Sequence, residues 1–143
     1  MLSDTGRTLI GFEPLFKYWA KELLYSFRDL TYRSTYNLAE DITLKNVSVS
    51  DVGIKVYLKK VKFGEQRDDT LDYHLQVESQ HLKMFAKLLI EMLTNREDFV
   101  EFESLEIDPE LKCILYECYH AKDKTDMREY DRYEQEIARF IQK

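Results

Sequence analysis

The stretch that most constrains the fold is residues 13–30, EPLFKYWAKELLYSFRDL, which carries the longest helical pattern in the chain. Its apolar residues recur every three or four positions, so a helix gathers them on one face. Pro14 suits the first turn of such a helix, where a backbone N–H has no partner within the helix. We therefore expect a helix that packs against a broad apolar surface through Leu15, Phe16, Trp19, Ala20, Leu23, Leu24 and Phe27.

Between residues 41 and 77 the apolar pattern changes to alternation, which is typical of half-buried strands. One strand is expected over 42–49, with a bulge or a break near Lys45 and Asn46, and a second over 54–63. A third strand over 71–77 completes an antiparallel meander. Residues 99–107 are a candidate fourth strand, although their acidic side chains equally fit a loop.

Three more helices are predicted in the remainder of the chain. Ser79 is a candidate cap for the first of them, which runs to about Leu93. Asp108 and Pro109 predict the start of another, and a last helix begins near Asp126. The expected fold is therefore a single α+β domain over residues 1–143. It has an antiparallel sheet of three to four strands packed by two long amphipathic helices, with two further helices at its C-terminal end.

Composition points to a protein that functions without a membrane. The chain has no apolar run of about twenty residues, no leader and no lipidation motif, which indicates the cytoplasm. Cys113 and Cys118 are five residues apart on a predicted helix, so their side chains lie on different sides and we expect no disulfide between them.

Candidate catalytic and metal-binding motifs are sparse. His74, Glu78 and His81 have the spacing of metal ligands on one helix, but the alternating pattern assigns His74 to a strand and His81 to the helix after it. Cys118 and His120 resemble a thiol and its base, yet a cysteine on an apolar helical face is more often a core side chain. Nucleotide-binding loops and serine-hydrolase motifs are absent from the sequence. We therefore expect no enzyme activity, no metal and no cofactor.

A lysine-rich stretch offers one binding surface. Lys45, Lys55, Lys59, Lys60, Lys62 and Arg67 surround Tyr57, and the candidate nucleic-acid patch is Lys55, Lys59, Lys60 and Lys62. The predicted order of one helix, three strands and a second helix is similar in topology to the double-stranded-RNA-binding domain, which begins its second helix with lysines. The corresponding residues here, Gln80, His81, Leu82 and Lys83, include one lysine. Lysines on a strand also fit ordinary edge protection.

An acidic, aromatic segment offers a second candidate binding surface. The net charge of the chain is −6, and residues 91–143 hold 8 Lys/Arg against 15 Asp/Glu. Carboxylates attract a basic partner, and apolar anchors between them would hold the complex. The same segment also fits a solvated loop that keeps the protein soluble. The predicted contact residues are Glu97, Asp98, Phe99, Glu101, Phe102, Glu103 and Glu106, extended by exposed Tyr130 and Tyr133 on the last helix.

These observations favour a small acidic binding protein that acts by protein–protein contact. The expected role is an inhibitor or neutraliser of a basic or nucleic-acid-handling protein. Immunity proteins, antitoxins and phage inhibitors of bacterial defence share this composition, which points to a bacterial or phage origin. Two alternatives remain: a nucleic-acid-binding module that uses the lysine stretch, and a structural or oligomeric subunit that uses the last helix.

Overall fold

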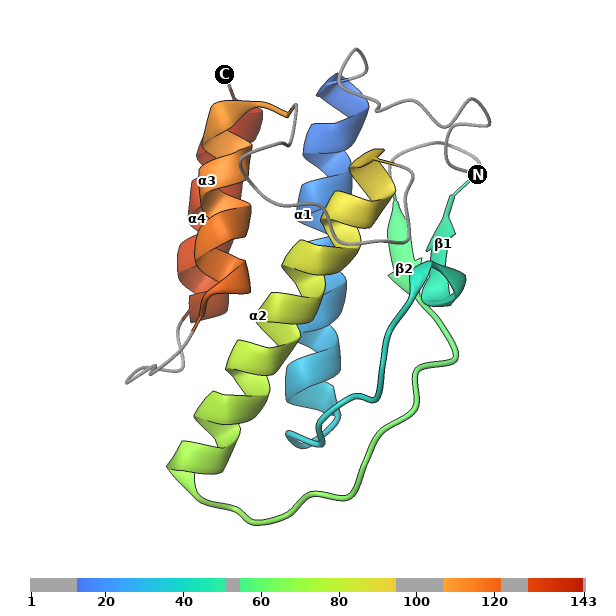
Figure 1. Ribbon diagram of the computed structural model, residues 1–143, viewed down its shortest axis with the longest axis vertical. Helices are drawn as coiled ribbons and strands as arrows, with labels where there is room; N and C mark the ends of the chain where they lie inside the picture. Colours follow the sequence, from blue (N-terminus) through green and yellow to red (C-terminus); the bar gives the residue numbers. More distant parts are fainter. Residues whose placement is uncertain (1–12, 51–54, 95–106, 122–128, 143) are drawn as a thin grey trace.

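The computed structural model describes residues 13–50, 55–94, 107–121 and 129–142, with the side chains of residues 13–17 and 129 left out (Figure 1). This part of the chain contains four α-helices and one two-stranded antiparallel sheet, so the fold mixes helix and strand. In chain order the elements are α1 (Glu13–Arg33), a 3₁₀ turn η2 (Leu44–Asn46), β1 (Val47–Val49), β2 (Val56–Leu58), α2 (Leu71–Thr94), α3 (Pro109–Tyr119) and α4 (Glu129–Ile141).

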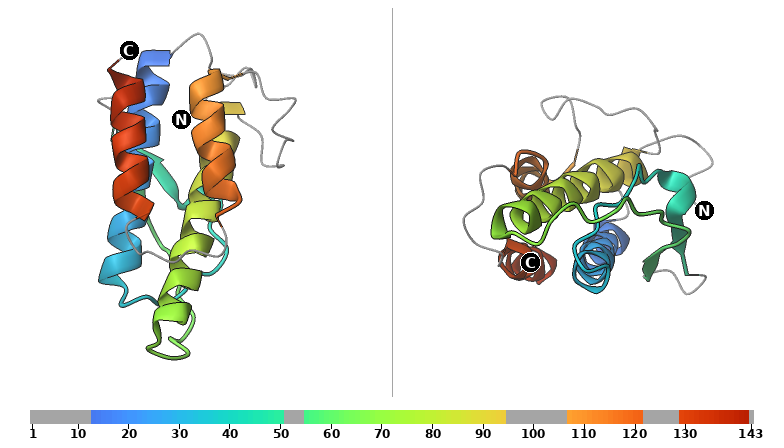
Figure 2. Two further views of the ribbon diagram at one scale, coloured as in Figure 1. Left: turned by 90° about the vertical axis from the view of Figure 1, so that its left-hand side faces the viewer. Right: turned by 90° about the horizontal axis from the view of Figure 1, so that it is seen from below.

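Helix α1 lies between α4 on one side and the β1–β2 pair on the other, as the view from below shows (Figure 2). Helix α2 crosses in front of α1 in the view of Figure 1, packs against it and also contacts α3. The outward side of α1 is therefore flanked by two different elements, a helix and a strand. This arrangement determines which of its side chains reach solvent.

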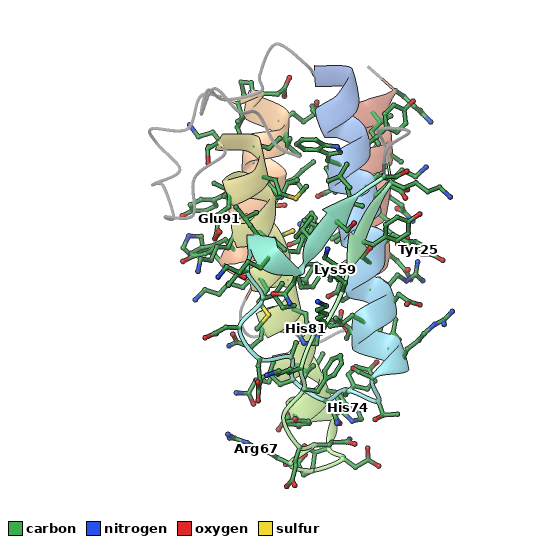
Figure 3. The ribbon with its side chains drawn as sticks, turned by 90° about the vertical axis from the view of Figure 1, so that its right-hand side faces the viewer. Tyr25, Lys59, Arg67, His74, His81 and Glu91 are labelled. Carbon is green, nitrogen blue, oxygen red and sulfur yellow. The ribbon has the colours of Figure 1, made fainter. Side chains whose placement is uncertain are left out.

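The sheet is much shorter than the sequence predicts. Thr43 caps the 3₁₀ turn, since its Oγ1 accepts from the Lys45 N–H while the Asn46 side chain accepts from the Thr43 N–H. The predicted break near Lys45 and Asn46 is thus confirmed, and β1 begins only at Val47. On the partner strand, the Asn46 amide donates to the carbonyls of Lys59 and Lys60, and Lys60 has a φ of 54°. This turn ends β2 at Leu58, near Lys59 in Figure 3.

Residues 71–77, predicted as a third strand, form the first two turns of α2, so the strand prediction is wrong. Thr70 caps this helix by accepting from the Tyr73 N–H (3.2 Å), and Asp68 in turn accepts from the Thr70 N–H. Ser79 lies inside α2 and is not a cap. The described residues therefore do not have the topology of the double-stranded-RNA-binding domain. The candidate fourth strand over 99–107 falls almost entirely outside the described residues.

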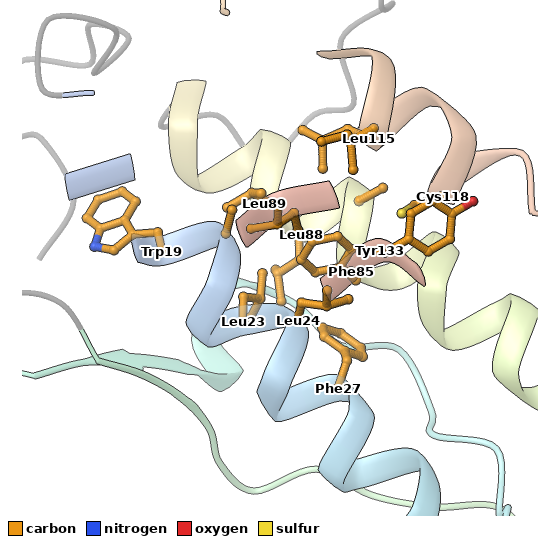
Figure 4. Packing of buried hydrophobic residues seen from close by; sticks show 14 of the residues in the cluster. Trp19, Leu23, Leu24, Phe27, Phe85, Leu88, Leu89, Leu115, Cys118 and Tyr133 are labelled. Carbon is orange, nitrogen blue, oxygen red and sulfur yellow. The ribbon is translucent and has the colours of Figure 1, made fainter. Parts of the chain in front are cut away.

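The core is centred on α2, of whose 24 residues 15 are buried. Trp19, Leu23, Leu24 and Phe27 of α1 pack against its apolar side chains, as predicted from the pattern of residues 13–30 (Figure 4). Helices α3 and α4 complete the cluster with Leu111, Ile114, Leu115, Cys118, Tyr130, Tyr133, Ile137 and Phe140.

The start of α3 follows the sequence prediction. Asp108 caps the helix, since its Oδ1 accepts from the Glu110 N–H at 2.8 Å, and Pro109 occupies the first turn. The helix ends at Tyr119, one residue before the predicted His120.

Candidate functional site

The predicted acidic contact residues, Glu97 to Glu106, lie outside the described residues, and their role stays a prediction. The two tyrosines expected to extend that surface are described, and there the prediction is wrong. Tyr130 and Tyr133 expose 0% and 1% of their surface because they face α1 and α3 as part of the core. Their spacing places them with Ile137 and Phe140 on one face of α4, which is the buried face.

The four lysines of the candidate nucleic-acid patch, Lys55, Lys59, Lys60 and Lys62, are not buried. Within the strand, alternation puts Val56 inside and Tyr57 outside, half exposed beside Lys55 and Lys59. Phe63 is also exposed, just after the last of these lysines. The structure thus groups basic and aromatic side chains along one stretch of chain, and residues 55–63 contain no carboxylate.

A buried polar cluster joins three helices, and its hydrogen bonds define where the protons lie. The Ala39 N–H donates to His81 Nε2 (3.1 Å), so Nε2 has no proton and Nδ1 carries it. The Thr31 hydroxyl donates to the Phe27 carbonyl at 2.8 Å. Its oxygen therefore accepts from both His81 Nδ1–H (2.7 Å) and the Tyr130 hydroxyl (2.9 Å). His81 is thus held in the neutral form, and burial lowers its pKa to about 4.

A hydrogen-bonded environment of this kind leaves no lone pair of His81 for a metal. Contrary to the sequence assignment, His74, Glu78 and His81 do lie on the same helix, α2. His74, however, stacks on Tyr36 at 4.2 Å and has Nε2 3.2 Å from an Asp69 oxygen. Among the described residues, no three metal-binding side chains converge.

Cys118 is wholly buried in the core, which confirms its interpretation as a core side chain. His120 is exposed at the end of α3, where it contacts the rings of Tyr116 and Tyr119. Cys113 is free and exposed. Because the Cys118 thiol is fully buried, it is not accessible to a substrate.

The feature that sequence analysis missed is a row of exposed tyrosines on α1, which we call the α1 ridge: Tyr18, Tyr25 and Tyr32. They are spaced by seven residues, close to two helical turns, and therefore lie near one line along the helix. At its end the Tyr32 ring contacts that of buried Tyr130, and its hydroxyl donates to Glu78 at 3.4 Å, so Tyr18 and Tyr25 are the outward members. Tyr25 is the most exposed large hydrophobic side chain in the described part, at 62%. The heptad spacing was readable in the sequence, but the stronger buried pattern of the same helix obscured it.

Two grooves flank the α1 ridge, and Tyr25 borders both of them. The β2 groove, of about 560 Å³, lies between α1 and the stretch that includes β2. The α4 groove, of about 470 Å³, lies between α1 and α4. The β2 groove has Leu30, Val56, Leu58 and Val61 among its lining, and the α4 groove has Leu24, Ile137 and Ala138.

The two grooves are lined by different charged side chains, apart from Glu22. Lys21 and Arg28 line only the α4 groove, where Arg28 pairs with Asp131 (2.9 Å) and Glu134 (2.7 Å). The hydrogen bond to Glu134 and the charges of these two carboxylates raise the pKa of Arg28, which stays charged. Asp29, Arg33 and Lys55 line only the β2 groove, with Asp29 and Arg33 paired at 2.6 Å, whereas Glu22 borders both grooves.

No helix in the described ranges is long and apolar enough to cross a membrane. The sequence matches no protein-family model, and no curated protein is similar enough to indicate a relative. The residues themselves therefore carry the functional argument.

Proposed function

We propose that this chain is a small acidic cytoplasmic protein that acts by protein–protein contact, with the α1 ridge as one contact surface. The observation that carries the proposal is the exposure of Tyr25 between two apolar-lined grooves. A tyrosine ring provides a large contact area at low entropy cost, and tyrosines are enriched at the energetic centres of interfaces. The rigid helix beneath them keeps the rings in place.

The acidic segment suggests the class of a second, foreign partner. Residues 97–110 hold seven carboxylates and no basic residue, which favours a basic protein surface. In this proposal the chain neutralises a basic or nucleic-acid-handling protein through Glu101, Glu103 and Glu106. This part of the proposal rests on the sequence alone.

Photo-crosslinking tests the ridge even while the partner is unidentified. Benzoylphenylalanine replaces Tyr25 in cells of the native host, and the crosslinked product is identified by mass spectrometry. The matched control places the same group at Tyr116, which lies on α3 and is 51% exposed. We expect a discrete protein adduct from position 25 that is absent from position 116. Equal adducts at both positions, or none at 25, would refute the ridge as a contact surface.

A charge reversal tests the acidic segment separately. The triple variant Glu101→Lys, Glu103→Lys, Glu106→Lys is compared with the wild type in nuclease-treated affinity capture. We expect the foreign partner to be lost while far-UV circular dichroism stays unchanged. If the triple variant captures the same protein as the wild type, the acidic surface is not the binding site.

A second candidate function is binding of single-stranded nucleic acid. The supporting observation is the run of Lys55, Tyr57, Lys59, Lys60, Lys62 and Phe63, because lysines bind phosphates and exposed rings stack on bases. Binding of a fluorescent oligonucleotide should weaken steeply as salt rises, and Tyr57→Ala should bind more weakly than the control Tyr116→Ala. Equal affinity of both variants would argue against a stacking site on β2.

A further inference from the structure

We infer that residues 38–40 and 62–64 form an acid-sensitive flap, which opens separately from the helical core when His81 takes up a proton. The first segment leads from α1 to β1, and the second leads from β2 to α2. This conformational change needs no partner, so it is independent of the proposed contact surfaces.

The two segments of the flap are held to each other by their own backbone. The Glu40 N–H donates to the Lys62 carbonyl at 2.8 Å, and the Gly64 N–H donates to the Leu38 carbonyl at 2.9 Å. The middle residues of the two segments form an antiparallel bridge between these hydrogen bonds. Neither hydrogen bond involves a helix, so the flap can move away from the helices as one unit.

The flap is joined to α2 through one buried residue. The Ala39 N–H donates to His81 Nε2 at 3.1 Å, and Ala39 is 3% exposed. Glu40, Lys62 and Phe63 are all exposed, so they bury little apolar surface. Segments with few buried apolar contacts open locally, at a lower free energy than global unfolding requires. The hydrogen bond to His81 is therefore a large part of what keeps the flap closed.

The orientation of the His81 ring couples opening to protonation. Its Nδ1–H donates to the Thr31 hydroxyl of α1, which also accepts from Tyr130 of α4, so this side of the ring faces the helices. The lone pair is on Nε2, which faces the flap. A proton can bind Nε2 only after the Ala39 N–H has moved away. Once protonated, Nε2 no longer accepts from Ala39, and the closed form is lost.

The other titratable groups of the cluster come from all four helices. Burial raises the pKa values of Tyr32 and Tyr130, so both hydroxyls stay neutral in acid. The charges of Glu78 on α2 and Cys118 on α3 raise the pKa of Tyr130 further, which shows that these groups lie nearby. Glu78 is 1% exposed and lies one turn before His81. Every variant below retains these four groups, so their effects cancel in each comparison.

A second histidine lies close to the flap and needs its own control. His74 stacks on Tyr36 at 4.2 Å, just before the first segment of the flap, and its Nε2 is 3.2 Å from an Asp69 oxygen. This imidazole does not bond to the flap backbone. Its protonation therefore should not decide whether the flap is closed.

The pH range of opening follows from the two states of His81. In the closed form burial lowers its pKa to about 4, whereas in the open form the ring has the ordinary value of 6.5. The open form therefore binds a proton first as pH falls below 6.5. The opening constant should rise about tenfold between pH 7 and pH 5.5, and it should be constant above pH 7.

Amide hydrogen exchange, measured by NMR on the full chain, tests this coupling. Each rate is divided by the intrinsic rate at the same pH to give a protection factor. We expect the protection of the Ala39, Glu40 and Gly64 amides to fall together, about tenfold from pH 7 to pH 5.5. His81→Gln can still accept from Ala39 but does not titrate, so its protection factors should stay constant. His74→Gln should retain the wild-type fall. Constant protection in the wild type, or the same fall in His81→Gln, would overturn the proposal.

Urea distinguishes the flap from global unfolding and needs no variant. Global unfolding exposes much surface, so the protection it controls falls steeply with urea, whereas a local opening depends on urea only weakly. Below the unfolding transition, we expect nearly constant protection for Ala39, Glu40 and Gly64. The control amide is that of Leu89, which is buried within α2 and should lose protection steeply. Equal urea slopes for the flap amides and Leu89 would show that the flap opens only when the whole protein unfolds, which overturns the inference.

Discussion

Acidification should destabilise this protein through His81 before most carboxylates begin to titrate. The folded protein holds His81 neutral, with a pKa of about 4, because burial disfavours its charged form and its Nε2 accepts from the Ala39 N–H inside the core. The unfolded chain has the ordinary histidine pKa of 6.5. The unfolded state therefore binds a proton first as pH falls, so folding stability is full above pH 6.5 and declines toward pH 4.

The magnitude follows from the two pKa values. One pKa unit corresponds to about 1.4 kcal/mol, so the free energy of unfolding should fall by about 1.4 kcal/mol between pH 7 and pH 5.5. The full loss by pH 4 approaches roughly 3 kcal/mol, a large share of the stability of a small domain. Urea unfolding followed by circular dichroism at pH 7, 6 and 5.5 measures this change.

His81→Gln is the matched variant, since its amide oxygen can accept from Ala39 but does not titrate. It retains His74 and His120, so their contributions cancel in the comparison. We expect its unfolding free energy to change little between pH 7 and pH 5.5. If wild type and His81→Gln lose the same stability over that range, the neutral buried histidine is not responsible and the reasoning is wrong. An NMR titration of the His81 ring in the folded protein gives the same answer directly.

Three further substitutions test the fold, each by urea denaturation at pH 7. Thr31→Val keeps the side-chain shape but leaves His81 Nδ1–H and the Tyr130 hydroxyl without their acceptor, so it should lower the free energy of unfolding by roughly 2 to 4 kcal/mol. Thr31→Ser keeps the hydroxyl and should lower it much less. Asp108→Ala removes the cap of α3 and should cost about 1 kcal/mol, whereas Asp108→Asn should be nearly neutral. Thr35 has a φ of 56° and is exposed, so Thr35→Gly should stabilise the protein by up to about 1 kcal/mol. No loss with Thr31→Val or Asp108→Ala, or a loss with Thr35→Gly, would contradict these assignments.

The sequence alone predicted the helices that have one clear apolar face or a strong start signal. Helix α1 was predicted from the spacing of Trp19, Leu23 and Phe27, because only one side of that helix meets the core. Asp108 and Pro109 marked α3 because capping is a local interaction between neighbours in the chain. Neither signal depends on what the rest of the chain does.

The first turns of α2 were misread because apolar side chains there alternate along the chain. Tyr73, Leu75 and Val77 are all buried, although on a helix they project in different directions. A helix covered on more than one side has no amphipathic period, and its pattern can resemble a strand. The cap at Thr70 was a local signal that could have corrected the assignment.

The contact surface depended wholly on tertiary structure. Sequence patterns placed Tyr130 and Tyr133 on the predicted binding surface, but packing against α1 and α3 buries them. Tyr25 reaches solvent because α4 and β2 lie on either side of α1 and leave its outward face open. The sequence by itself indicated the helices that have one apolar face or a strong cap, and it determined how charge is spaced along α1. Which faces are covered follows from contacts between segments far apart in the chain, and only the folded structure decides these.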